Sequence, residues 1–135
     1  MSHLENCMHR ETWSKKGNNF ALEIVRWQHP NYINGKEYGV KYVWNIYCYI
    51  YPKHRLFDEL KIEDIEGGYS FNFHMGCSFC KWSRNKQRKV ECKQYGCDYA
   101  HYGDEEFDTI KNIEDNYVIQ NDAEDLFNEL DKLED

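Results

Sequence analysis

Two early stretches of the chain alternate between apolar and polar positions and predict a β-hairpin. Residues 18–29 follow the two-residue period of a strand, and residues 38–52 are rich in β-branched and aromatic side chains. Between them, Asn34 and Gly35 favour a tight turn, because both central positions of such a turn need positive φ angles. In the second stretch, Cys48 lies among apolar side chains and is expected in the core.

The middle of the chain predicts further short elements. Residues 53–60 are typical of one or two helical turns, and residues 69–75 alternate again like a third strand. Residues 85–96 are expected to return as a fourth strand, followed by a short helical turn over residues 98–102. Residues 104–120 carry the weakest pattern of the chain.

The C-terminal segment predicts an amphipathic helix. Asn121 can cap it, and Glu124 three residues later completes a capping-box pattern. Acidic residues fill one face of this helix, and the other face is an apolar stripe. The stripe consists of Leu126, Phe127, Leu130 and Leu133. The whole pattern predicts one α+β domain over residues 1–135, with an antiparallel β-sheet, a zinc-stabilised loop region and a C-terminal α-helix.

Four of the six cysteines and two of the six histidines gather in residues 74–104. A Cys-x-x-Cys pair can offer two thiolates from a tight turn, and a Cys-x-x-x-His pair can offer a thiolate and an imidazole from one helical turn. Three thiolates and one imidazole make a closed tetrahedral zinc site, and such soft ligands favour Zn²⁺ over hard cations. The expected ligands are Cys77, Cys80, Cys97 and His101, with Cys92 and His74 as alternates.

The sequence argues against other roles for these cysteines. The N-terminal segment has no apolar run like that of a signal peptide, and cytosolic thiols stay reduced, so disulfides are not expected. The zinc deaminase pattern and the His-Glu-x-x-His pattern of metalloproteases are both absent. A closed, sulfur-rich site suits a structural ion, so no enzyme is expected. Cys7, close to the N-terminus, is expected to be inert.

The formal net charge of −7 is concentrated at the C-terminal end of the chain. Residues 104–135 contain thirteen acidic and two basic side chains, so residues 1–103 carry a net charge of +4. Such a segment is either a solvated acidic helix or a surface that docks on a basic partner. The candidate docking residues are Asp104, Glu105, Glu106, Asp122, Glu124, Asp125, Glu129 and Asp131.

A basic loop over residues 81–93 is a further candidate surface. With Trp82 inside it and Tyr95 beside it, this loop could bind nucleic acid, because cations neutralise phosphates and aromatic rings stack on bases. The sequence pI of about 5.4 favours docking on a protein instead, so direct nucleic-acid binding is not expected. No stretch approaches the ~20 apolar residues of a membrane span, so a soluble intracellular protein is expected.

Two stretches, FHMGCSFC and YGCDYAHYGD, resemble motifs of a group of small phage-borne proteins, in which His-Gly-Gly-x-Thr-Tyr precedes Gly-x-Asp-x-x-His-x-Gly-Asp. The similarity covers residues 18–107, including WNIYCYIYPKHRLF, where Arg55 replaces a proline of the group. Met75 and Phe79 depart from the first motif. The group implies no particular function. The matching positions are His74, Gly76, Ser78, Gly96, Asp98, His101, Gly103 and Asp104.

Small size, acidity and a composition rich in Tyr, Asn, Lys and Ile, together with the expected zinc site, also make the chain similar to phage-encoded anti-CRISPR proteins, specifically zinc-containing inhibitors of the type II (Cas9) system. That resemblance implies a non-enzymatic protein in the cytoplasm of the bacterial host that binds Cas9 and blocks loading of target DNA. An acidic surface suits the positively charged channel in which Cas9 holds its heteroduplex. Two alternatives stay open. One is a zinc-dependent nucleic-acid-binding module that uses the basic loop, and the other is a small nucleotide-binding or hydrolytic phage protein that uses His74, Asp98, His101 and Asp104.

Overall fold

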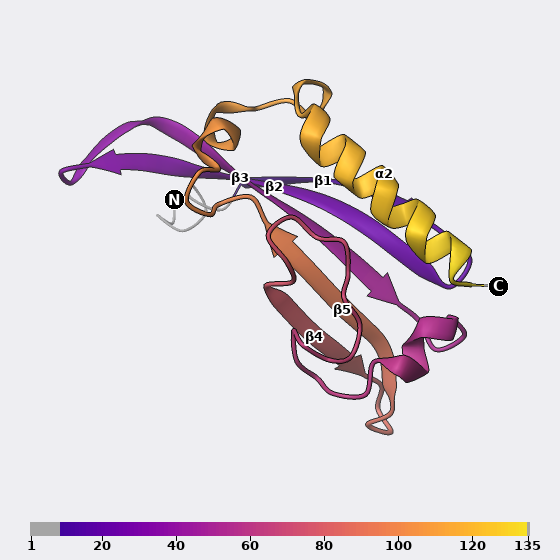
Figure 1. Ribbon diagram of the computed structural model, residues 1–135. Helices are drawn as coiled ribbons and strands as arrows, with labels where there is room; N and C mark the ends of the chain where they lie inside the picture. Colours follow the sequence, from indigo (N-terminus) through magenta and orange to yellow (C-terminus); the bar gives the residue numbers. More distant parts are fainter. Residues whose placement is uncertain (1–8, 135) are drawn as a thin grey trace.

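The computed structural model describes residues 9–134, which form a five-stranded antiparallel sheet with one long helix across it (Figure 1). The order of the strands in the sheet is β1-β2-β3-β5-β4. The predicted α+β class is confirmed. The strands are β1 (His9–Lys16), β2 (Phe20–Ile33), β3 (Lys36–Ile50), β4 (Phe79–Arg84) and β5 (Val90–Asp98). The helices are α2 (Tyr117–Lys132) and the short 3₁₀ helices η1 (Arg55–Glu59), η2 (Glu105–Thr109) and η3 (Ile113–Asp115).

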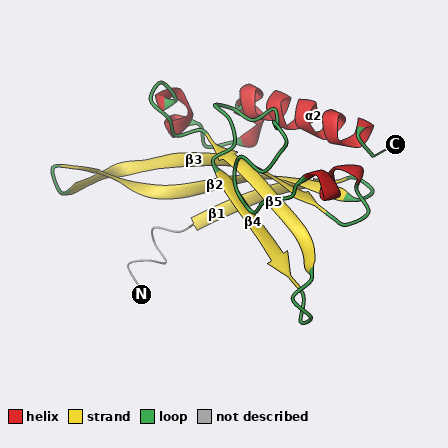
Figure 2. Ribbon diagram, turned by 60° about the horizontal axis from the view of Figure 1, so that its bottom comes forward, coloured by secondary structure: helices red, strands yellow, loops and turns green. Residues whose placement is uncertain are grey.

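The predicted hairpin is the central pair of the sheet, and its strands are longer than the sequence pattern indicated. Asn34 and Gly35 adopt φ angles of 51° and 80°, which is the positive-φ turn that the dipeptide favours. The pairing of β2 with β3 continues past a register shift between Pro30 and Tyr32. Among residues 9–134, the tip of the hairpin pairs with no other strand of the sheet, and it projects as an arm (Figure 2).

The core lies on the face of the sheet that α2 covers (Figure 1). Along β3, the even-numbered side chains from Trp44 to Ile50 are buried, with at most 1 % of each exposed, and they alternate with half-buried neighbours. The expected core position of Cys48 is therefore confirmed. From the helix, Ile119, Leu126 and Leu130 pack into the same cluster. Within residues 9–134, no helix has the length and apolar character needed to cross a membrane.

The C-terminal helix begins at Tyr117, four residues before Asn121, which the sequence pattern predicted as its cap. The cap is Asn116, whose side-chain oxygen accepts the Ile119 N–H at 3.1 Å. Ile119 is fully buried, so the first turn of the helix already belongs to the apolar stripe that packs on the sheet. The capping-box prediction was wrong because a second Asn stands where burial begins, and burial decides where the helix starts.

The predicted third strand over residues 69–75 is also wrong, since this segment pairs with no strand in the described part of the chain. Phe71 and Phe73 are both buried, and the ring of Phe71 lies 4.9 Å from the ring of Tyr95 on β5. The place beside β5 is taken by β4, which the sequence pattern did not predict, as it also missed β1. Residues 98–102 form the end of β5 and a bend, with no helical turn.

Candidate metal centre

His74, His101 and Asp104 meet at one end of the β4–β5 hairpin. His74 Nε2 lies 2.8 Å from Asp104 Oδ1 and 3.0 Å from Asp104 Oδ2. His101 Nδ1 lies 3.4 Å from Asp104 Oδ2. One ligand atom from each of the three side chains lies within 4.8 Å of the other two. This group could therefore hold a metal ion.

The turn after β5 fixes two of these side chains. The Asp104 N–H donates to the His101 carbonyl at 2.9 Å, and the His101 N–H donates back to Asp104 Oδ2 at 2.9 Å. Gly103 sits inside this turn with a φ angle of 97°, which favours glycine. The reciprocal hydrogen bonds hold the Asp104 carboxylate in the turn, with only 9 % of its side chain exposed.

Aromatic packing fixes the third side chain, His74. Its ring stacks on Tyr99, with centroids 4.4 Å apart and planes 10° apart, and the edge of Phe107 lies against it. Tyr99 is fully buried, and its hydroxyl donates to Asp122 Oδ2 on α2 at 2.6 Å. The imidazole is therefore positioned by the core and by the acidic helix. Tyr99 was not among the residues predicted for a site, although it continues the inward alternation of Tyr95 and Cys97 along β5.

The charges of the centre suit a divalent cation. Burial raises the pKa of Asp104, but hydrogen bonds from the His101 backbone and from His74 outweigh it, so the pKa is lowered overall. His101 Nδ1 is a buried atom without a hydrogen-bond partner among residues 9–134, although a second carboxylate, Asp98, lies 3.5 Å away. The carboxylates of Asp98 and Asp104 bring two negative charges to the centre, which one divalent ion would balance.

Asp98 is held beside the centre by its own hydrogen bonds. Its carboxylate accepts the Ala100 N–H at 3.0 Å and the Ser78 hydroxyl at 3.2 Å. A hollow of about 200 Å³ opens next to Asp104 and His101, and Lys41 contributes a cation to its lining. The two histidines keep 22 % and 32 % of their side chains exposed, so their rings border solvent although His101 Nδ1 itself is buried.

The expected cysteine-rich ligand set is not brought together. Among residues 9–134, the group of three or more potential ligands found within 4.8 Å contains no cysteine, and of the expected ligands it includes only His101, with the alternate His74. Cys97 faces the core, where burial raises the pKa of its thiol to about 12. Cys92 faces the other side of the sheet from Cys80, as their register on the hairpin shows. Cys7 lies outside the described residues.

The predicted docking residues divide into two groups. Asp104 is buried in the centre, while Asp122 and Glu129 accept hydrogen bonds from the hydroxyls of Tyr99 and Tyr69. The five that are exposed lie on η2 and α2, and they are Glu105, Glu106, Glu124, Asp125 and Asp131.

The basic loop over residues 81–93 is also partly engaged within the protein. Lys93 is buried, and its ammonium group donates to the carbonyls of Phe57, at 2.7 Å, and of Leu60. Arg84 pairs with Glu63 at 3.0 Å. These two side chains are the least available to a phosphate backbone.

Comparison of the chain with models of known protein families, with curated proteins and with solved structures gives no match. The donors of the centre are nitrogen and oxygen atoms that converge from two segments of the chain. A further carboxylate and a hollow lie beside them.

Proposed function

We propose that the protein holds one divalent transition-metal ion, Zn²⁺ in the first place, through His74 Nε2, His101 Nδ1 and the Asp104 carboxylate. The observation that carries the proposal is the convergence of these three donors within 4.8 Å of one another. Two imidazoles and a carboxylate form a ligand set that zinc and neighbouring first-row metals accept. The buried His101 Nδ1, which has no hydrogen-bond partner among residues 9–134, supports the same assignment, because such an atom otherwise costs free energy.

A site of this composition favours chemistry over a purely structural role. Three protein ligands are typical of catalytic zinc sites, in which a further position takes water or substrate, whereas structural sites are closed by four ligands. When bound, the ion would act as a Lewis acid and make its water more acidic. Asp98 stands 3.5 Å from His101 and could accept a proton beside the site. The reaction class favoured is metal-assisted hydrolysis of a small substrate that enters the hollow lined by Lys41.

Metal binding is tested by titrating the chelator-treated protein with Zn²⁺ and Co²⁺ in a calorimeter. One ion per chain is expected, and either Asp104→Asn or His74→Ala should raise the Kd for the ion at least a hundredfold. His29→Ala, on the projecting arm, is the matched control and should bind as the unmodified chain does. The Co²⁺ form should lack the intense near-ultraviolet band of sulfur ligation. Loss of binding in Cys77→Ser with retention in Asp104→Asn would overturn this ligand set.

Hydrolysis is tested separately, with the zinc-loaded protein and three probes: p-nitrophenyl phosphate, bis(p-nitrophenyl) phosphate and p-nitrophenyl acetate. Turnover of at least one probe should need zinc and should fall in Asp98→Asn without loss of metal. Full metal loading with no turnover of any of the three would leave the ion in place but refute a hydrolytic role for it.

Docking on Cas9 in the bacterial host is the second candidate function. It is favoured by the exposed acidic side chains on η2 and α2, which an electropositive channel would attract. In a pull-down, tagged protein should retain Cas9 and reduce its binding of target DNA. Replacing Glu124, Asp125 and Asp131 together by Lys should abolish retention, while His74→Ala should leave it intact. Equal retention by the charge-reversed variant would exclude this surface.

A further inference from the structure

The two edges of the sheet differ in how they are protected. At the β4 edge, the strand is short, its register shifts between Ser83 and Arg84, and the Trp82 N–H donates outward to Glu63 at 3.3 Å. The β1 edge has eight residues in unbroken register with β2 and contains no proline. Within residues 9–134, no hydrogen bond joins the outer side of β1 to another segment. A long, regular, uncovered edge strand is a template for pairing with another chain.

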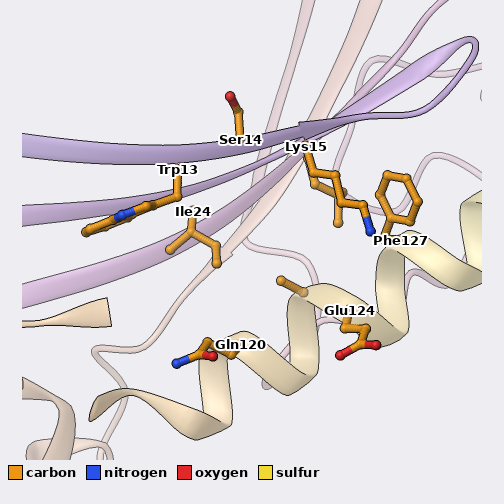
Figure 3. Close-up of a pocket in the computed structure, with 9 residues that line it drawn as sticks. Trp13, Ser14, Lys15, Ile24, Gln120, Glu124 and Phe127 are labelled. Atoms are coloured by element: carbon orange, nitrogen blue, oxygen red, sulfur yellow. The ribbon is translucent and has the colours of Figure 1, made fainter. Parts of the chain in front are cut away.

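An apolar groove runs beside this open edge. It lies between β1 and α2 and encloses about 440 Å³, which is within the size range of about 300–1,000 Å³ found for ligand sites. Figure 3 shows Trp13 and Ile24 on the sheet side and Gln120, Glu124 and Phe127 on the helix side. The groove therefore has an apolar floor with polar groups at its rim.

The floor of the groove is rigidly built. The Trp13 ring stacks on the fully buried Trp44, with centroids 5.7 Å apart and planes 17° apart. Leu22 is buried at the base, and Ala123 on α2 is the smallest side chain of the lining. A small residue at the middle of the helix face leaves room that a larger one would fill, so large side chains from outside can enter there.

The open strand is basic although the chain as a whole is acidic. Residues 9–16 carry Arg10, Lys15 and Lys16 against one acid, Glu11, and Glu11 is engaged by the buried Arg26 at 3.0 Å. The Lys15 ammonium group lies 4.1 Å from the centre of the Phe127 ring, at the mouth of the groove. A strand that pairs here meets positive charge near both ends of β1.

We propose that an extended segment of another protein adds to β1 as a sixth strand and places its side chains in the groove under α2. Strand addition draws its affinity from main-chain hydrogen bonds and its specificity from pockets for alternate side chains. Alternate residues of a strand point to one face, so every second residue of the partner is large and apolar and enters the groove. The residues between them are acidic and lie against the basic strand, since opposite charges on facing strands attract.

The probe for this proposal is a phage-displayed library of random decapeptides, selected on the full-length protein. Ala123→Trp fills the groove from the helix, and Asn121→Trp adds the same side chain at an exposed position outside the lining. Selection on the unmodified protein should enrich peptides that alternate acidic and large apolar residues. By fluorescence anisotropy, their Kd should rise at least tenfold on Ala123→Trp and change less than twofold on Asn121→Trp.

Two further measurements test the proposal without a variant that fills the groove. Methylating alternate backbone nitrogens of the best peptide, on the side that faces β1, should weaken binding at least tenfold, while methylating the other side should not. Lys16→Glu, on the face of β1 turned away from Trp13 and the groove, should weaken acidic peptides and leave neutral analogues unchanged. The proposal is overturned if no peptide prefers the unmodified protein to Ala123→Trp. It is also overturned if methylation on the side that faces β1 leaves the affinity unchanged, or if both methylation patterns weaken binding equally, because the ligand would then not pair as a strand.

Discussion

Zinc at the His74–His101–Asp104 centre should raise the thermal midpoint of unfolding by an amount that can be worked out. An ion that binds only the folded chain stabilises it by about 2.7 kcal/mol when free zinc is a hundredfold above Kd. The entropy of unfolding is about 2.1 cal/mol/K per residue, which for 135 residues is about 0.28 kcal/mol/K. The ratio of the two gives a rise of about 10 °C.

Removing one ligand should nearly abolish this rise. Asp104→Asn keeps the shape of the side chain but loses the negative charge that faces both histidines. If it weakens zinc a hundredfold, the stabilisation at the same free zinc falls to about 0.4 kcal/mol, or about 1.5 °C. Asp115→Asn, an exposed acid on η3, is the matched control and should keep the full rise.

Differential scanning calorimetry in a zinc-buffered solution, after dialysis against a chelator, measures these shifts. The reasoning fails if the unmodified protein gains nothing at saturating zinc, or if Asp104→Asn and Asp115→Asn shift equally. It fails in a different way if Cys77→Ser loses the rise, since the thiolate set expected from the sequence would then hold the ion.

Three further predictions concern the fold. Gly96→Ala should cost about 1–3 kcal/mol in urea unfolding, because its Cβ would lie 2.4 Å from Tyr47 Cδ1 and 2.9 Å from a backbone oxygen; an unchanged midpoint would refute the packing argument. Lys93→Met should cost about 2 kcal/mol, since two carbonyls at the end of η1 lose a cationic donor, and equal stability would mean that burying the charge offsets those bonds. Burial raises the pKa of the Cys97 thiol to about 12 from its usual 9.0, so the folded chain keeps a proton that the unfolded chain releases. Stability should therefore fall as pH rises from 9.0 to about 12. Cys97→Ala should flatten that part of the urea-unfolding profile, and a slope unchanged by the substitution would count against the burial of the thiol.

Local sequence patterns predicted those parts of the fold that depend on residues close together in the chain. The Asn34-Gly35 turn, the inward alternation along β3 and the apolar stripe of α2 are of this kind. The missed strands are those whose burial comes from distant segments. β1 has one large apolar side chain, Trp13, and it is a strand because it completes the edge beside β2.

The metal centre also has one part that local sequence predicts and one part that depends on distant segments. The available donors can be read from the order of the residues, which places both histidines and both aspartates of the centre within residues 74–104. Which of these donors meet depends on how the chain folds. The pairing of β5 with β3 turns Cys97 into the core, and the alternation along β5 places Cys92 on the other face of the sheet. His74 meets Asp104, thirty residues further along, through the turn after β5. Ligand spacing cannot encode that choice, because convergence on one ion depends on where each strand points its side chains, and this is set by pairing between segments far apart in the chain.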